Sequence, residues 1–159
     1  MHLTVFSDYT LRVLMYLALH RTRLATIPEI AAAYDISENH LMKVVHRLAR
    51  AGIVESVRGK GGGIRLARAP EDIRLGAIVR ASEGDAPIVE CLSGDPHACR
   101  ISRPCRLKGI LVGAFDALYD SLDRHTLADL VEQPRALRRA LGSGHGPLRV
   151  VGHPREIDQ

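Results

Sequence analysis

The stretch "ISENHLMKVVHRLARAGIVESVRGKGGGIRL" occupies residues 36–66 and joins one amphipathic helix to one short hairpin. Leu41, Val45 and Leu48 recur at helical spacing, so we expect them to be buried on one side of the helix. Short apolar segments then flank a glycine-rich turn at residues 58–63. Glycine accepts positive φ without steric cost, so these segments predict a β-hairpin.

Helices are predicted on both sides of this stretch. Residues 4–20 carry apolar side chains at helical spacing, and "TIPE" at residues 26–29 has the capping-box pattern that begins a second helix. Ser37 is expected to cap the third helix, over residues 38–52. Helix, turn, helix and hairpin in this order predict a mainly α-helical winged helix-turn-helix domain with a small β-hairpin.

The second half of the chain predicts further helices. We expect one over residues 75–83, a long one from about residue 105 to 122, and a short one over residues 125–132 that ends before Pro134. The long helix has an apolar stripe too broad for one small domain to cover, which predicts a partner helix against it. The stripe consists of Leu107, Leu111, Ala114, Leu118 and Leu122.

Positive charge is concentrated around the third helix and the hairpin. The chain has 159 residues and a formal net charge of +4, yet residues 39–68 hold seven basic residues and a single acid, Glu55. Such a local excess indicates a polyanionic partner. Aromatic residues make up only 4% of the chain and Trp is absent, so stacking on single-stranded bases is disfavoured and duplex DNA is favoured.

A polar stripe along the third helix supplies candidate DNA contacts. A major groove admits one helix with hydrogen-bonding side chains, although an ordinary solvated face would carry the same residues. The basic hairpin favours DNA, because two phosphate-seeking elements then flank one domain. Arg58 could enter a minor groove or bind a phosphate, and Lys60 is expected to bind a phosphate. The DNA-binding candidates are Ser37, Asn39, His40, Lys43, Arg47, Arg50, Arg58 and Lys60.

All three cysteines lie in an irregular segment, at Cys91, Cys99 and Cys105. The chain shows no signal peptide and no apolar run of membrane-spanning length, so we expect a cytoplasmic protein whose thiols stay reduced. Three thiolates suit an iron–sulfur cluster, zinc or copper(I). His97 could complete a zinc site, but the gaps of seven and five residues are longer than those of zinc knuckles. Three cysteines without a ligand remain the alternative.

The remaining polar residues show neither a clear metal-binding nor a catalytic pattern. Asp8 lies in the first turn of the first helix, where the helix dipole favours a carboxylate whether or not it binds a ligand. No Ser/His/Asp grouping, phosphate-binding loop or paired carboxylates indicate an enzyme.

Four stretches together resemble the IscR/NsrR family of bacterial iron–sulfur winged-helix transcription regulators. They are "LTVFSDYTLRVLMYLA", residues 36–66 as quoted above, "CRISRPCRLK" and "TLADLV", and the resemblance covers about residues 1–134. It is closest to the nitric-oxide-sensing repressors of the family, which pair an "FSDY"-type start with a "CRLK"-type end of the cysteine loop. The cluster-biogenesis regulators carry a histidine where this chain has Lys108.

The resemblance implies a homodimer, joined through the long helix, that represses transcription at an inverted repeat in promoters and senses nitric oxide. It implies a cluster, [4Fe–4S] or alternatively [2Fe–2S], held by Cys91, Cys99 and Cys105, with Asp8 of the partner subunit as the fourth ligand. A cluster shared in this way would link the dimer body to the partner's DNA-binding domain. It would thereby fix the spacing of the two domains, which must match the helical repeat of DNA.

This interpretation divides the chain into four parts. Residues 1–84 form the winged helix-turn-helix domain, 85–105 the cluster-binding loop, 106–141 the dimerisation helix with a short C-terminal helix, and 142–159 a disordered tail. Two alternatives stay open. The same DNA-binding scaffold could sense iron–sulfur supply, oxygen or redox state, or the chain could be a zinc-stabilised winged-helix interaction module.

Overall fold

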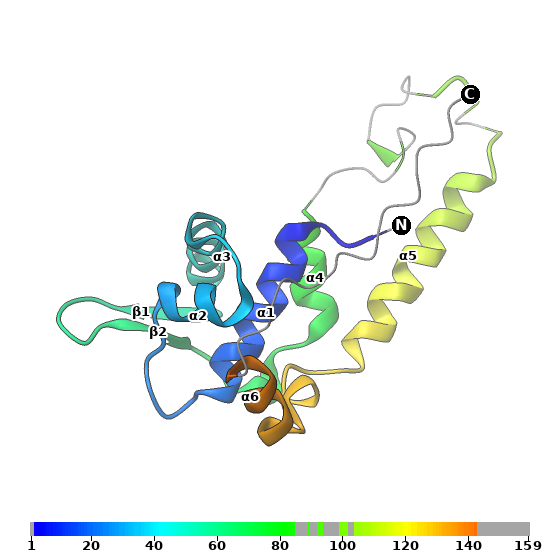
Figure 1. Ribbon diagram of the computed structural model, residues 1–159. Coiled ribbons are helices and arrows are strands. Elements are labelled where there is room, and N and C mark those ends of the chain that lie inside the picture. Colours follow the sequence, from blue (N-terminus) through cyan, green and yellow to red (C-terminus); the bar gives the residue numbers. More distant parts are fainter. Residues whose placement is uncertain (1, 85–88, 90–91, 94–98, 102–103, 143–159) are drawn as a thin grey trace.

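The computed structural model describes residues 2–84, 89, 92–93, 99–101 and 104–142, and it confirms a mainly α-helical fold with one β-hairpin (Figure 1). Among these residues no helix combines the length and the apolar character needed to cross a membrane. The elements are α1 (Val5–Leu19), α2 (Ile27–Tyr34), α3 (Glu38–Arg50), β1 (Val54–Val57), β2 (Gly63–Leu66), the 3₁₀ helix η1 (Pro70–Asp72), α4 (Leu75–Glu83), α5 (Leu107–Asp123), the 3₁₀ helix η3 (Asp129–Val131) and α6 (Pro134–Gly142).

Helix α1 is the centre of the domain and contacts α2, α3, α4 and β2. Its N-cap is Thr4, whose side-chain oxygen accepts a hydrogen bond from the Ser7 backbone N–H at 3.2 Å, which satisfies one free donor of the first turn. Val13 and Leu14 are fully buried in its middle. Burying one such side chain stabilises the fold by about 2 kcal/mol, so α1 holds the other helices in place.

Helices α2 and α3 form the helix-turn-helix as predicted. Thr26 and Glu29 make the expected capping box, and Asp35 ends α2 in the left-handed conformation at φ 54°. Helix α3 buries Leu41, Val44, Val45 and Leu48. Ser37 is the N-cap residue of α3, as predicted, but its hydroxyl makes no capping hydrogen bond. Its backbone carbonyl accepts hydrogen bonds from the N–H groups of His40 and Leu41.

Strands β1 and β2 form the wing, with Val54 opposite Leu66 and Val57 opposite Gly63. Strand β2 is also fastened to the loop after α1, because Ala25 and Ile64 exchange two backbone hydrogen bonds of 3.0 and 2.7 Å. This bridge holds the base of the wing against the domain, while its turn projects away from the other elements (Figure 1).

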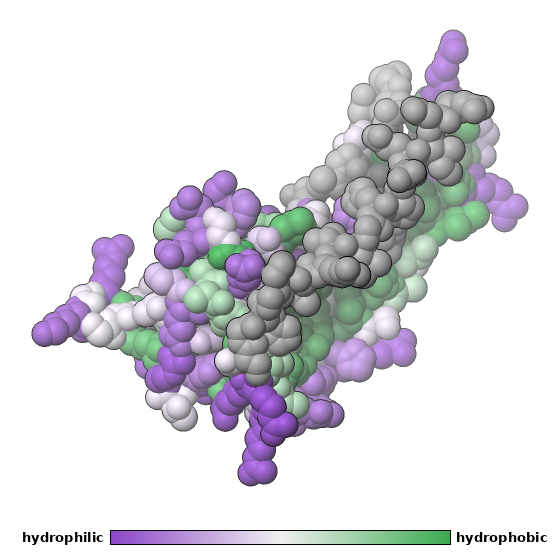
Figure 2. Space-filling view, viewed as in Figure 1, coloured by the Kyte–Doolittle hydropathy of each residue, from purple (hydrophilic) through white to green (hydrophobic). Residues whose placement is uncertain are grey.

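Helix α5 meets α4 at one end and diverges from it towards the other (Figure 1). None of the residues of α5 is buried. The two helices meet near the end of α5, where the Asp123 carboxylate accepts a hydrogen bond from the Ala77 N–H at 2.9 Å. The Arg80 guanidinium lies 4.1 Å from the centre of the Tyr119 ring. Apolar side chains follow the rest of α5 at the surface (Figure 2), and those of Leu107, Ile110 and Val112 are 54, 64 and 41% exposed. Of the predicted stripe, Leu107 and Ala114 are exposed, and the described chain only partly covers Leu111, Leu118 and Leu122.

The C-terminal region differs from the prediction. Residues 125–132 form a turn and the three-residue helix η3, and Pro134 begins α6 instead of following the last helix. Proline suits the first helical position, because the N–H that it lacks would have no partner there. Gly142 belongs to α6, so any tail begins after it, and residues 143–159 lie outside the described residues. The predicted division into four parts stays a prediction.

Glu29 should make the stability of this domain depend on acid. Hydrogen bonds from Arg23 lower the pKa of Glu29 from 4.5 to about 2, in spite of partial burial, and the Tyr16 hydroxyl donates a further hydrogen bond of 2.6 Å. A carboxyl whose pKa is lowered by folding stabilises the fold above its unfolded pKa. We expect this contribution to be complete above pH 4.5 and to disappear as the pH falls towards 2.

The test replaces Glu29 with glutamine. Glu29→Gln should lower the free energy of unfolding at pH 7 by about 1 kcal/mol, a modest value because water screens an ion pair at the surface. It should also flatten the dependence of the urea midpoint between pH 4.5 and 2. Arg23→Gln should act in the same way, whereas Arg21→Gln, in a longer exposed pair with Glu71, should not. If Glu29→Gln leaves the pH dependence of the urea midpoint unchanged, another carboxyl group causes that dependence.

Candidate nucleic-acid interface and cluster ligands

The polar stripe of α3 lies at the surface, as the sequence predicts. Asn39, His40, Lys43 and Arg50 are exposed on the side of the helix opposite its buried leucines and valines. Ser37 is exposed at the N-terminus of the same helix. These side chains can reach a DNA groove without any change in the core.

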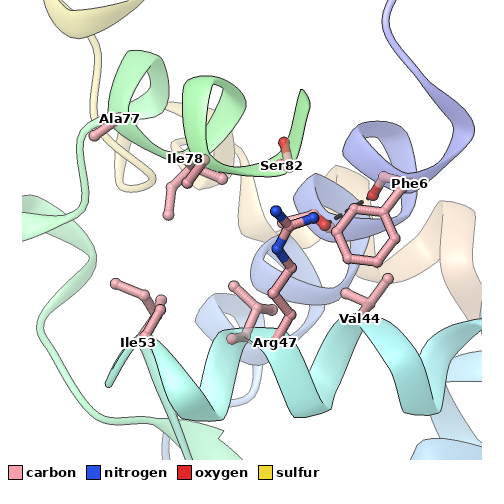
Figure 3. A pocket seen from close by; sticks show the side chains of 11 residues that line it. Phe6, Val44, Arg47, Ile53, Ala77, Ile78 and Ser82 are labelled. Carbon is pink, nitrogen blue, oxygen red and sulfur yellow. Dashed lines mark hydrogen bonds between the residues drawn. The ribbon is translucent and has the colours of Figure 1, made fainter. Parts of the chain in front are cut away.

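Arg47 is exposed, but its charged end does not follow the rest of the stripe. Its guanidinium lies over the ring of Phe6 in α1, 5.2 Å from the ring centre (Figure 3). One of its terminal nitrogens is also 3.8 Å from the point that a Cβ on Gly84 would occupy, where the cysteine segment begins. Near the start of α3, the ring of His40 lies 6.0 Å from that of Tyr9. Helix α3 therefore contacts α1 through Arg47 and His40, and Arg47 also lies near the end of α4.

Phe6 and Tyr9 were not singled out in the sequence. They lie two residues before and one residue after Asp8 in α1, so the "FSDY" stretch contains the residues that contact α3 as well as the predicted ligand. An aromatic pair spaced three residues apart on one helix face was the available signal.

The tip of the wing carries Arg58 and Lys60, both exposed. Gly59 and Gly61, on either side of Lys60, have φ values of 102° and 78°, which residues with a side chain rarely adopt. Neither cation has an acidic partner among the described residues, whereas Arg65 at the base pairs with Glu55. The unpaired cations of the wing are thus concentrated at its tip, and Figure 2 shows a hydrophilic tip.

Asp8 lies on the surface of α1 with its side chain 46% exposed. Its Oδ1 accepts a hydrogen bond from Arg12 Nε at 3.0 Å, and its Oδ2 forms an ion pair with Arg12 Nη2 at 2.8 Å. Arg12 also lies over the ring of Tyr34, 5.8 Å from its centre. An exposed pair four residues apart contributes only about 0.3–0.5 kcal/mol, so Asp8 can exchange Arg12 for another partner at little cost.

Cys99 and Cys105 are free thiols and are partly exposed. Cys91 and His97 lie outside the described residues. No three metal-binding side chains come together within the described part of the chain. Two accessible thiols outside any disulfide fit a soft metal or an iron–sulfur cluster, provided that other ligands complete the site.

Glu83, which the sequence analysis did not identify, joins the start of α1 to the end of α4. One of its carboxylate oxygens accepts hydrogen bonds from the Thr4 N–H at 2.8 Å, from the Thr4 hydroxyl at 3.0 Å and from the Ser7 hydroxyl. Partial burial works in the opposite direction, but these hydrogen bonds hold the pKa of Glu83 below its usual value. The contact fixes the helix that carries Asp8 next to the point where the cysteine segment leaves the domain.

The sequence model of Rrf2, described as an iron-dependent transcriptional regulator, matches residues 3–133. The chain belongs to the Rrf2 family. Among curated relatives of this Rrf2 protein, the HTH-type transcriptional regulator NsrR of Bacillus subtilis is 48% identical over 142 residues, which is 89% of this chain and 97% of the relative. The regulator of the same name from Geobacillus kaustophilus is 43% identical over 147 residues, covering 92% of this chain and the whole relative.

Solved Rrf2 structures share the fold. IscR of T. potens has a TM-score of 0.66 with 28% sequence identity, and the match covers 83% of this chain and 87% of that one. CymR, the global cysteine regulator of B. subtilis, has a TM-score of 0.65 with 30% identity, and the match covers 82% of this chain and 95% of that one. Family membership confirms the resemblance that the sequence motifs predicted. It also confirms that this Rrf2 protein is a transcription regulator and not an enzyme.

Proposed function

We propose that this Rrf2 protein is a homodimeric repressor that binds an inverted repeat in promoter DNA and senses nitric oxide through an iron–sulfur cluster. The observation that carries the DNA-binding part is the placement of exposed cations on two separate elements of one winged domain, α3 and the wing tip. The nitric oxide signal rests on the sequence resemblance and on relatives that bear the NsrR name.

A second copy of the chain is the partner that suits α5. Its exposed apolar side chains repeat along the helix, and a self-complementary stripe is what a twofold symmetric dimer requires. Pairing two α5 helices would remove these side chains from water and would place the two winged domains at the ends of one dimer.

The cluster ligands in this proposal are Cys91, Cys99 and Cys105 of one subunit and Asp8 of the partner subunit. When bound, an iron–sulfur cluster supplies iron that reacts with nitric oxide. The Asp8 carboxylate is a harder donor than a thiolate and a weaker partner for iron. Arg12, which holds both carboxylate oxygens in this structure, is positioned to take Asp8 back when it loses iron.

The decisive experiment follows operator binding while anaerobically purified protein is titrated with nitric oxide. The operator is first selected from a random duplex library by the same protein. Elemental analysis should find iron and acid-labile sulfide, and nitric oxide should release the operator in proportion to the iron that has reacted. Zinc in place of iron would support the interaction-module alternative. If oxygen or iron removal releases the operator and nitric oxide does not, the protein senses redox state or iron–sulfur supply instead of nitric oxide.

Mixed dimers test whether Asp8 acts across the interface. An Asp8→Ala chain and a Cys99→Ala chain are coexpressed with different tags, and the mixed dimer is isolated. If Asp8 serves the cysteines of the partner subunit, one site receives both changes and the other none. We therefore expect half of the wild-type circular dichroism of the cluster. If Asp8 serves its own subunit, neither site is intact, and the wild-type signal should be absent.

The wing tip should contribute sequence-independent affinity. Replacing Arg58 and Lys60 together with alanine should weaken binding to any duplex about tenfold and should reduce the slope of log K against log salt by about two, one for each lost phosphate contact. The measurement is fluorescence anisotropy over a range of salt concentrations. Arg135→Ala, an exposed cation on α6, is the matched control. Equal salt slopes for the wild type and the double variant would show that the wing tip makes no phosphate contacts.

A further inference from the structure

A cavity of about 180 Å³ lies between α1, α3 and α4 (Figure 3). Its walls are mainly apolar and include Phe6 from α1, Val44 from α3 and Ile78 from α4. Ile53, just after α3, closes one side. The cavity therefore touches the helix that we expect to read DNA and both helices that lead to the proposed cluster ligands.

The polar side chains that line this cavity differ in whether they already have a hydrogen-bond or ion-pair partner. The buried hydroxyl of Ser82 is already hydrogen-bonded to the Ser7 hydroxyl at 2.8 Å and to the Val79 carbonyl at 3.0 Å. The Thr10 hydroxyl donates to the Phe6 carbonyl at 2.8 Å. Arg47, in contrast, has no carboxylate partner among the described residues, and its guanidinium lies only over an aromatic ring. The lining thus combines an apolar wall with one available positive charge.

Size and charge together define the ligand. An apolar cavity of about 150 Å³ holds a benzene molecule, so the space here fits a six-membered carbon ring. A carboxylate on that ring could accept two hydrogen bonds from a guanidinium, the geometry that arginine and carboxylate prefer. We propose that this cavity binds a small aromatic monocarboxylate, with its ring among the apolar side chains and its carboxylate on Arg47.

Occupancy of the cavity should also affect DNA binding, a consequence that rests on the proposed function. Arg47 belongs to the polar stripe of α3 and is expected to contact DNA. A bound carboxylate would hold its guanidinium inside the domain. Ligand and operator then compete for one side chain, and each weakens the binding of the other by the same factor, because equilibrium coupling is reciprocal.

Binding is tested first, on the full chain without DNA. Benzoate is titrated into protein with labelled isoleucine methyl groups. Shifts should be largest at Ile53 and Ile78 and should be small at Ile30 and Ile73, which lie in the core away from the cavity. The dissociation constant should be on the order of 1 mM. Benzamide is a neutral molecule of the same shape and lacks the charge that Arg47 recognises. Its affinity should be at least about tenfold lower than that of benzoate.

Filling the cavity should abolish this binding. Ala81→Leu, in the α4 wall, should weaken benzoate binding at least about tenfold, and Ala51→Leu, at the end of α3, should do the same if the first variant does not fold. Ala32→Leu, an exposed position on α2 outside the lining, is the matched control and should bind normally. Absence of shifts at Ile53 and Ile78 in the wild type, equal affinity for benzamide, or normal binding to both filled variants would each overturn the assignment.

The second arm measures operator affinity at saturating benzoate, with sodium chloride at equal ionic strength as the reference. Wild-type protein should bind its operator about fivefold more weakly, and Ala81→Leu should show no benzoate effect. If benzoate binds but operator affinity is unchanged, the proposed competition for Arg47 is wrong, whereas the assignment of the cavity as a benzoate site is kept. A protein that binds no operator even without benzoate would overturn the proposed function, and the methyl shifts would still decide the cavity.

Discussion

Replacing Cys99 with alanine should abolish the visible absorption of the anaerobically purified protein and lower its operator affinity about 100-fold. The variant removes one of three proposed thiolate ligands, and Cys99 is a free, partly exposed thiol outside any disulfide. A coupling of about 2–3 kcal/mol between ligand binding and DNA binding corresponds to about two orders of magnitude in affinity. Absorption spectra and anisotropy at one fixed salt concentration measure the two effects together.

The remaining DNA binding of Cys99→Ala should be non-specific and strongly salt-dependent, since the cations of α3 and the wing are unchanged. Arg100→Ala, at the adjacent exposed residue, should keep both the absorption and the affinity. If the Cys99→Ala protein binds its operator as tightly as the wild type, operator affinity does not depend on Cys99. That result would contradict the proposed coupling between cluster binding and DNA binding.

Gly76→Ala should lower the free energy of unfolding by about 2 kcal/mol, the usual cost of adding a methyl group where no space exists. A Cβ at this position would lie 2.5 Å from Cγ of Asp123 and 2.5 Å from the carbonyl oxygen of Tyr119. Relief requires α5 to move away from α4, which would break the hydrogen bond between Asp123 and the Ala77 N–H. Urea unfolding monitored by circular dichroism gives the loss directly.

Gly109→Ala is the matched control for this prediction. Gly109 also lies in a helix, α5, but a Cβ there would meet nothing within 4 Å. Alanine favours the helix over glycine by up to about 1 kcal/mol, so this variant should be as stable as the wild type or more so. Equal destabilisation by the two variants would show that the close approach of α4 and α5 does not limit stability.

The sequence predicted the winged domain well, because its elements are set by local patterns. The spacing of Leu41, Val45 and Leu48, the capping box at residues 26–29 and the glycine turn each depend on neighbours within a few residues. The error at Pro134 has the same origin, since a proline can follow one helix or begin another, and only the surrounding structure decides.

The roles of the candidate site residues stay predictions, and the structure adds contacts of these residues that the sequence did not predict. Helical periodicity placed Arg47 on the polar side of α3, yet the ring under its guanidinium belongs to Phe6, near the start of the chain. The carboxylate of Glu83 meets Thr4 across 79 positions. Pairings over such distances depend on how the helices pack, which no local pattern specifies.

Helices α4 and α5 are fastened to each other where α4 begins and α5 ends, through Asp123 and Ala77, while the cysteine segment connects their opposite ends. Insertions and deletions in that segment therefore need not alter how the two helices meet. Doubling the length of a loop costs only about 0.6 kcal/mol in closure entropy. The proposed cluster-binding segment can therefore change in length and composition while the packing of α4 against α5 is kept.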